Sequence, residues 1–292
     1  MTEIVRVPLR EWTGSTLSAD ARDDALHALE AAKILFFPQL PYSVERIELL
    51  RANTLAAGSK NLSYDSATGR LRSAELAAPV REAVKSALER YCTSARSLVL
   101  GLFPRYAAGL IVGRTSFRPA EIAGRESSWR KDDTRLHVDS FPSTPVQGKR
   151  ILRVFSNVNP EGEPRAWRSG EPFEDVAKKF VPDIPPLAHG VSLLLACLKI
   201  TKQRRTAYDH YMLKLHDRMK SDAQYQSRVP ASAFEFPAGT SWMVYTDQVS
   251  HAAMRGSCAF EQTFYIPVEA MESPESSPLR ILERLTHARL AS

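Results

Sequence analysis

Three residues in the sequence have the types and the order of a metal-binding group: His137, Asp139 and His251. His137 and Asp139 flank Val138 in a short stretch typical of a strand, where side chains two residues apart point to the same face. An imidazole and a carboxylate on one face, joined by a later histidine, form the 2-His-1-carboxylate facial triad. This triad binds Fe(II) and leaves coordination positions open for a co-substrate and oxygen. We therefore predict an iron centre held by these three residues.

The segments around the three residues support this interpretation, because a His-x-Asp triplet alone is too short to be specific. His137 and Asp139 lie between a polar segment, 130–135, and a turn-forming segment, 140–145. His251 lies between two strand-like segments. Two strands that present ligands near their ends are typical of a double-stranded β-helix. Two alternatives stay open, namely a hydrogen-bonded surface pair of His137 and Asp139, and a His251 that caps the following turn.

The elements that must hold these residues change in character near residue 100. Before it, apolar residues at helical spacing predict helices, and after it, short β-branched and aromatic runs between Pro and Gly predict strands. We expect helices over 20–33, 43–55, 80–99, 171–180 and 206–221, and a closing helix from Pro278 to Leu290. We expect strands over 34–37, 110–112, 136–139, 151–158, 191–200, 234–236, 241–245 and 260–266, and a polar loop over 61–70.

These elements predict an α+β fold with one domain over residues 1–292. Its core is a double-stranded β-helix, the jelly roll of cupins, over 101–270. A helix-rich part precedes the core over 1–100, a helical insert interrupts it over about 199–230, and a C-terminal helix follows over 276–292.

The composition is that of a globular protein, with 43% hydrophobic and 25% charged residues in 292. It excludes a disordered chain, a collagen-like repeat and a disulfide scaffold, and the three cysteines match no zinc-ribbon spacing. The start of the chain lacks the pattern of a signal peptide, and the longest apolar run, 191–198, is too short to span a bilayer. We therefore expect a cytoplasmic location, with peripheral contact to a membrane still open.

Positive charge exceeds negative charge in two parts of the chain, and the formal net charge is +6. Seven basic and three acidic residues lie in 199–222, and ten basic and five acidic residues lie in 105–153, around the predicted iron centre. This distribution indicates an anionic partner. The predicted helix 206–221 is basic and amphipathic, so it either docks on an anionic membrane or packs its apolar face into the core.

The stretch from Ser128 to Phe180 resembles the Kdo hydroxylases, Fe(II)- and 2-oxoglutarate-dependent dioxygenases that act on the lipopolysaccharide of Gram-negative bacteria. The segments that carry the resemblance are 129–143 (WRKDDTRLHVDSFPS), 153–160 (RVFSNVNP) and 167–173 (WRSGEPF), with further likeness over most of the chain, including 208–212 and 246–251. The resemblance implies hydroxylation at C3 of the Kdo sugar of Kdo-lipid A to give the Ko sugar, with succinate and CO2 as co-products. It implies Fe(II), 2-oxoglutarate and O2 as cofactors, and His137, Asp139 and His251 as the iron ligands.

The partner implied by the resemblance is Kdo-lipid A, an anionic glycolipid met by peripheral contact at the cytoplasmic face of the inner membrane, and no nucleic acid is expected. Arg118, Arg130 and Lys131 are the residues we expect to contact its carboxylates and phosphates. Two other functions stay open: a 2-oxoglutarate oxygenase that acts on nucleic acid or protein, and a non-catalytic cupin-like module that binds a glycolipid.

The sequence departs from the wider superfamily at the position of the residue that binds the far carboxylate of 2-oxoglutarate. Many members place an arginine about ten residues after the distal histidine, where this chain has no lysine or arginine and Gln262 occupies the neighbourhood. A dicarboxylate in a partly dry pocket needs a cation, preferably a guanidinium. The candidates are Arg153, Arg255, Arg150, Gln262 and Asn157. Arg153 stands between apolar neighbours, which favours a buried functional role for it.

Overall fold

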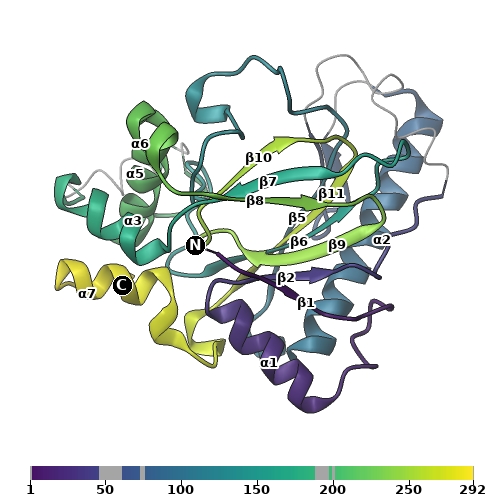
Figure 1. Cartoon of the computed structure of the whole chain (residues 1–292), viewed down its shortest axis with the longest axis horizontal. Coiled ribbons are helices and arrows are strands. Elements are labelled where there is room, and N and C mark those ends of the chain that lie inside the picture. The colour runs from purple at the N-terminus through teal and green to yellow at the C-terminus, as the bar shows by residue number, and fades with distance from the viewer. Residues whose placement is uncertain (1, 46–60, 73–75, 188–196, 199–200, 292) are drawn as a thin grey trace.

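The strands form two β-sheets of unequal size, and helices flank both (Figure 1). The computed structural model describes residues 2–45, 61–72, 76–187, 197–198 and 201–291. The predicted α+β class is confirmed. Most of the predicted helix 43–55 and of the predicted strand 191–200 lies outside the described residues.

The large sheet is antiparallel except at one edge. Its eight strands are β1 Ile4–Arg6, β2 Ile34–Phe37, β3 Leu62–Asp65, β4 Arg70–Arg72, β5 Ile111–Arg118, β6 Arg150–Asn157, β9 Thr240–Tyr245 and β11 Ala259–Ile266. Their order is β1-β2-β9-β6-β11-β5-β3-β4, with β1 and β2 parallel. At the centre, β6 pairs with β9 and β11, and all three strands are almost wholly buried.

The small sheet lies against the inner face of the large one (Figure 1). Its strands are β7 Arg165–Ser169, β8 Ser232–Phe236 and β10 His251–Arg255, paired antiparallel in the order β10-β7-β8. Aromatic side chains from both sheets fill the space between them, and the rings of Phe236 and Trp242 stack at 4.1 Å between centroids. Burial of these rings from water holds the two layers together.

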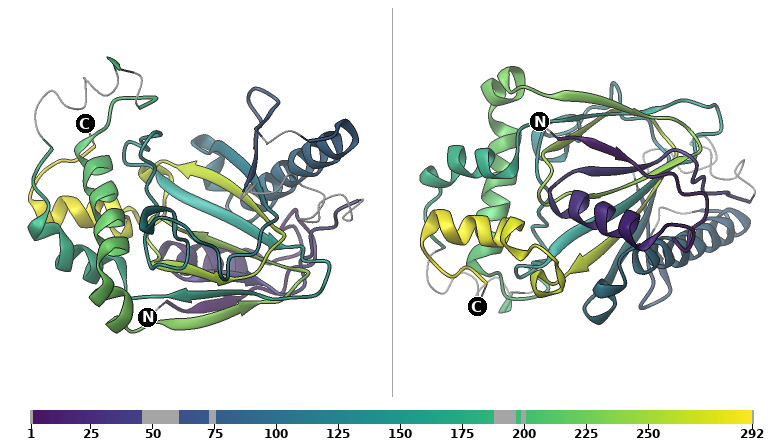
Figure 2. Two further views of the ribbon diagram at one scale, coloured as in Figure 1. Left: turned by 90° about the horizontal axis from the view of Figure 1, so that it is seen from above. Right: turned by 60° about the horizontal axis from the view of Figure 1, so that its bottom comes forward.

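The helices form two groups (Figure 2). Helices α1 Ala19–Glu30 and α2 Ala78–Leu102 cover the outer face of the large sheet, where their apolar side chains pack against β6 and β9. Helices α3 Phe173–Phe180, α5 Ala207–Ser221, α6 Ala223–Arg228 and α7 Pro278–Thr286 lie at one end of the sheets. The helices predicted over 20–33, 80–99, 171–180 and 206–221 are therefore confirmed. The predicted C-terminal helix is shorter, because His287 adopts a left-handed conformation at its end.

This second group of helices fixes which way the predicted iron ligands point. Leu136 and Val138 are fully buried in the apolar cluster that includes side chains of α3, α5 and α7. In extended backbone, neighbouring side chains point to opposite sides. His137 and Asp139 alternate with these two residues and therefore face the space between the sheets.

Some local predictions are wrong. The predicted loop 61–70 contains β3, whose Leu62 and Tyr64 are buried in the apolar cluster that includes α2 side chains, and Arg70 begins β4. The stretch 136–139 is extended, but it joins the rest of the sheet structure through a single bridge to His251. Strands β1, β7 and β10 were not predicted, because they are short and β7 alternates arginine with small and aromatic residues.

Candidate metal centre and its cavity

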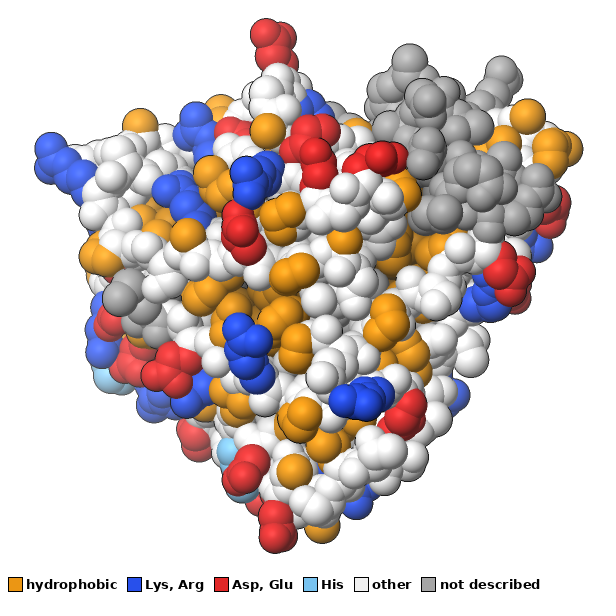
Figure 3. Space-filling model, turned by 45° about the vertical axis from the view of Figure 1, so that its right-hand side comes forward, with side chains coloured by type: hydrophobic (Ala, Val, Ile, Leu, Met, Phe, Trp, Pro, Cys, Tyr) orange, Lys and Arg blue, Asp and Glu red, His pale blue; other side chains and the backbone are white. Residues whose placement is uncertain are grey.

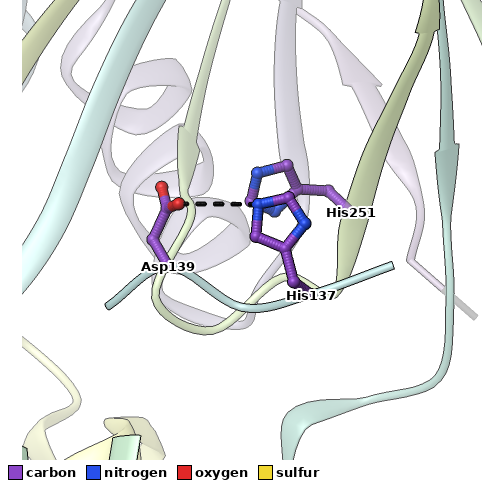
Figure 4. A group of neighbouring side chains, drawn as sticks. All are labelled: His137, Asp139 and His251. Carbon is purple, nitrogen blue, oxygen red and sulfur yellow. Dashed lines mark ion pairs between the residues drawn. The ribbon is translucent and has the colours of Figure 1, made fainter. Parts of the chain in front are cut away.

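His137, Asp139 and His251 come together in one buried group. Their exposed fractions are 7%, 8% and 5%, and one candidate ligand atom from each lies within 4.8 Å of the others. Figure 4 shows the three side chains converging, with the Asp139 carboxylate facing the two imidazoles. The backbone holds this geometry, because His137 and His251 exchange two N–H···O bonds of 3.0 and 2.9 Å. The backbone N–H of Asp139 donates to Thr246 O at 2.8 Å.

Both imidazoles are oriented by a hydrogen bond on the far side of the ring. Nδ1 of His137 lies 2.7 Å from Arg135 O, and Nδ1 of His251 lies 2.8 Å from Val249 O. A carbonyl oxygen only accepts, so each Nδ1 carries the proton and each Nε2 keeps its lone pair for the group. Burial lowers the pKa of both histidines, and each therefore stays neutral near pH 7. Neutral imidazole is the form that binds a metal.

Asp139 supplies the carboxylate of the group. Its Oδ1 lies 3.8 Å from His137 Nε2, and its Oδ2 lies 3.0 Å from Arg153 Nη2 as an ion pair without an aligned hydrogen bond. Burial alone would raise the pKa of Asp139, but the charge of the Arg153 guanidinium holds this pKa below its ordinary value. Arg153 Nη1 also lies 2.9 Å from Glu261 Oε1. An ionised carboxylate therefore stands beside two neutral imidazoles, which is the donor set of the facial triad.

A cavity of about 440 Å³ adjoins the group and lies between the two sheets and α5. The large sheet lines it with Arg118, Arg153, Phe155 and Glu261, the small sheet with Arg165, Trp167 and Ala253, and α5 with His216, Asp217 and Lys220. The lining contains six basic and four acidic side chains apart from the histidines. Such a lining suits an anionic ligand.

Arg165 and Trp167 on β7 are site residues that the sequence analysis missed. Arg165 is buried, its Nη1 donates to Gly256 O at 3.1 Å, and its Nε has no partner among the described residues. Burial and the nearby Arg118 guanidinium lower the pKa of Arg165 to about 10. The Trp167 ring stacks on the His251 ring at 5.2 Å, and its indole N–H has no partner in the described chain. Arg165 and Trp167 stand two residues apart, as side chains on one face of a strand do, and this spacing was the signal by which they could have been found.

Arg150 and Gln262, two of the predicted candidates for 2-oxoglutarate, are not among the residues that line the cavity. Arg150 is fully buried on the other face of β6 and bonds to Asp247 at 2.8 Å. Gln262 accepts a 2.5 Å bond from Thr115 Oγ1. Side-chain alternation explains both placements, because Arg150 is three residues from Arg153 and Gln262 is next to the inward-facing Glu261.

Asn157 and Arg255 also lie outside the cavity lining. Asn157 donates to Glu163 O at 2.9 Å and Phe236 O at 3.0 Å, so its amide shapes the turn after β6. Arg255 is half exposed and forms a 2.6 Å ion pair with Glu235. Of the five predicted candidates for 2-oxoglutarate, only Arg153 is among the residues that line the cavity.

The three predicted substrate contacts do line the cavity. Arg118 donates to Glu261 Oε2 at 2.8 Å, and Arg130, with its guanidinium over the Trp129 ring at 4.2 Å, lies at the exposed mouth with Lys131. A second cavity of about 400 Å³ shares Arg118 with the first. The second cavity therefore adjoins the first.

Helix α5 buries its apolar face in the protein. The sequence had left open whether this face packs into the core or docks on a membrane. Its buried apolar residues are Tyr208, Tyr211, Met212, Leu215 and Met219, which pack among the other helices. The packed-helix prediction is therefore confirmed. No helix in the described part of the chain is both long and apolar enough to cross a membrane. On the face drawn in Figure 3, basic and acidic side chains are interspersed with hydrophobic ones.

Comparisons with known proteins agree with this arrangement. A family model described as 3-deoxy-D-manno-oct-2-ulosonic acid (Kdo) hydroxylase matches residues 12–289. A crystal structure of a Kdo hydroxylase with cobalt(II), a non-haem Fe(II) and α-ketoglutarate dependent dioxygenase, is 44% identical, with a TM-score of 0.95 over 100% of this chain and 98% of that chain. A Kdo hydroxylase with α-ketoglutarate and Fe(III) is 42% identical, with a TM-score of 0.94 over 99% and 98%. A search of curated proteins gave no match.

Proposed function

The chain belongs to the Kdo hydroxylase family of Fe(II)- and 2-oxoglutarate-dependent dioxygenases, and from this premise we propose that it hydroxylates C3 of the Kdo sugar of Kdo-lipid A. One oxygen atom of O2 enters the C3–H bond and the other enters succinate, while 2-oxoglutarate loses CO2. The observation that carries the proposal is the buried group of His137, Asp139 and His251 in the wall of a cavity lined by more basic than acidic side chains.

His137, Asp139 and His251 would hold the iron through two Nε2 atoms and one carboxylate oxygen. The protonation states fit this role, because both imidazoles are neutral and the carboxylate is ionised. Iron with 2-oxoglutarate supplies the oxidising chemistry when bound. Arg153 positions the Asp139 carboxylate, and the Trp167 ring keeps water from one side of His251.

Arg165 is the residue we assign to the far carboxylate of 2-oxoglutarate. The Arg118 guanidinium, close enough to lower the pKa of Arg165, repels that of Arg165, and a bound carboxylate would relieve that repulsion. The unpartnered Nε of Arg165 and indole N–H of Trp167 are buried donors that such a carboxylate would satisfy. Arg153 is less suited to this role, because two carboxylates already bind it.

We also propose that residues 1–292 act as one dioxygenase domain whose two facing sheets form a double-stranded β-helix. The aromatic layer between the sheets and the bridge between His137 and His251 support this. The substrate is a lipid, so the enzyme would work in the cytoplasm at the inner membrane surface. There, Arg130 and Lys131 at the cavity mouth would meet the phosphates of lipid A.

The test is mass spectrometry of Kdo-lipid A incubated with the enzyme, Fe(II), 2-oxoglutarate and oxygen. We expect a gain of about 16 Da that fragmentation assigns to the Kdo sugar, with one succinate formed per oxygen inserted. Asp139→Ala removes the carboxylate ligand and should abolish both products. Succinate formation by this variant at the wild-type rate would contradict the ligand assignment, and an oxygen found on the acyl chains would contradict the substrate site.

A further inference from the structure

Lys220, near the end of α5, is a buried lysine in the cavity wall. Its exposed fraction is 2%, and its ammonium forms no hydrogen bond or ion pair with any of the described residues. Burial lowers the pKa of Lys220, while the Asp133, Asp139 and Asp132 carboxylates, none of which forms an ion pair with it, act to raise this pKa. Lys220 lines the same cavity as the metal group of His137, Asp139 and His251. An unpaired buried charge is unfavourable, so a lysine kept here indicates an anionic ligand.

The backbone around Lys220 is tied to the segment that carries the first predicted ligand. Lys220 O accepts a 2.8 Å bond from Arg135 Nη1, and Arg135 O lies 2.7 Å from His137 Nδ1. The His216 ring, one turn earlier in α5, contacts the His137 ring edge-on at 5.4 Å between centroids. Gln226 Nε2 also bridges Leu136 O and Met219 O, at 2.9 and 2.8 Å. These bonds hold the base of the Lys220 side chain at a fixed place relative to the metal group.

We propose that Lys220 binds the C1 carboxylate of the Kdo unit that is hydroxylated, an inference that rests on the proposed function. In a 3-deoxy-oct-2-ulosonic acid the carboxylate is C1 and the deoxy carbon is C3, and both are bonded to C2. When C3 lies at the metal group, the carboxylate must lie in the same cavity, two bonds away. A cation that pairs with it must therefore stand beside the metal group.

The other cations in the cavity are less suited to this carboxylate. Arg118 and Arg153 already bind carboxylates of the chain, and Arg165 on the opposite wall is assigned to 2-oxoglutarate. Arg130 and Lys131 are exposed at the mouth. Among the described residues, Lys220 and Arg165 are the buried cations of the lining without a carboxylate ion pair, and Arg165 is already assigned to 2-oxoglutarate. A neutral sugar would leave it unpaired, so Lys220 selects for ulosonic acids.

The experiment measures binding of the α-methyl glycoside of Kdo, and of its C1 carboxamide, to the Co(II)- and 2-oxoglutarate-loaded enzyme by calorimetry. We expect Lys220→Gln to weaken binding of the carboxylate form by about 30-fold or more, because one partner of a buried charge pair is removed. The carboxamide should bind wild type and Lys220→Gln equally weakly. Lys214→Gln, which removes an exposed lysine of the same helix, is the control and should leave both affinities unchanged.

Two further measurements separate this role from others. The affinity of Lys220→Gln for 2-oxoglutarate should equal that of wild type. Its melting temperature should be equal to or higher than that of wild type, because a buried charge is removed. Loss of 2-oxoglutarate affinity instead of glycoside affinity would overturn the inference. If Lys220→Gln preferred the carboxylate over the carboxamide as strongly as wild type does, the inference would also be overturned. The proposed hydroxylation of Kdo-lipid A would not be affected by that result. A wild-type enzyme that neither binds the glycoside nor hydroxylates Kdo-lipid A would overturn the proposed function together with the inference.

Discussion

At the scale of single residues, the arginines that line the cavity differ in the protein groups with which they pair. Arg153 is held between Asp139 and Glu261, so its charge is used within the protein to position a carboxylate. Arg165 makes one bond to a backbone carbonyl and keeps a buried donor without a partner in the described chain. Buried donors are satisfied in folded proteins, by protein, water or ligand. The free donor of Arg165 therefore marks the wall where a ligand anion completes the structure.

Replacement of Arg165 tests this assignment. We expect Arg165→Met to raise the KM for 2-oxoglutarate by about 10- to 100-fold, because charge-assisted hydrogen bonds are worth about 1.5–3 kcal/mol. Arg165→Lys should recover only part of the loss, since an ammonium cannot form the two parallel bonds of a guanidinium. Succinate formation is measured against 2-oxoglutarate concentration. An equal rise in Arg255→Met, whose side chain pairs with Glu235 outside the cavity, would contradict the assignment.

The predicted iron ligands and part of the basic cavity lining, including Arg118 and Arg153, could be proposed from the sequence, whereas Arg165 was missed. His137 and Asp139 stand two apart between apolar residues, and this local pattern is enough to put them on one face. The cations come from three strands, β5, β6 and β7, and their meeting depends on register, which no local pattern gives. Because Arg150 and Arg153 are three residues apart on one strand, only one of these two alternative candidates could face the cavity.

At the level of elements, the segment joining β9 and β10 aligns the two chain segments that carry the predicted ligands. Arg150 bonds to Asp247 at 2.8 Å and to Gln248 at 2.6 Å, with its guanidinium 3.8 Å from the centroid of the Tyr245 ring. Thr246 O in the same segment accepts from Asp139 N at 2.8 Å. Arg150 thus supports the site from behind the large sheet, although it was predicted to bind 2-oxoglutarate.

Gly256, just after β10, allows β7 to pass close by. Its φ is +110°, and a Cβ there would lie 3.0 Å from Arg165 Cα. We expect Gly256→Ala to lower the free energy of unfolding by about 1–3 kcal/mol and to raise the KM for 2-oxoglutarate by moving Arg165. Denaturant titration and succinate kinetics measure the two effects.

The matched control is Gly239→Ala. Gly239 has a φ of +77° and no atom within 4 Å of its added Cβ, so this variant carries the backbone strain without the contact. It should lose stability through backbone strain and keep the wild-type KM. If both variants changed the KM for 2-oxoglutarate by the same factor, this result would contradict the claim that the close packing of Gly256 on Arg165 positions the Arg165 guanidinium.

Helices were predicted better than strands for a physical reason. Helix α2 has apolar residues at the period of a helix over seven turns, so many residues repeat the same signal. Strand β7 has five residues, and its inward positions are Arg165, Trp167 and Ser169 instead of an apolar row. A strand that lines a ligand cavity loses the alternation by which strands are recognised.

Across the whole molecule, Glu30 joins the N-terminal helix to the C-terminal segment. Glu30 is buried at the end of α1, and its carboxylate accepts from Tyr106 Oη at 2.7 Å and from the backbone N–H groups of Glu272 and Ser273 at 3.0 and 2.6 Å. That segment leads into α7, which packs in the apolar cluster behind His137 and Asp139. Residues from both ends of the chain therefore support the metal group from its far side.

Substitution of Glu30 separates this long-range support from catalysis. Glu30→Ala leaves the buried Tyr106 hydroxyl and two partly buried backbone N–H groups without their acceptor, so we expect the free energy of unfolding to fall by about 1–3 kcal/mol. Glu30→Gln keeps a carbonyl acceptor and should lose less. Because Glu30 is not among the residues that line the cavity, folded Glu30→Ala should keep the wild-type KM for 2-oxoglutarate while α7 becomes more sensitive to proteolysis. Unchanged stability would mean that water replaces the carboxylate at no cost, and the two ends of the chain would then be coupled only through apolar packing.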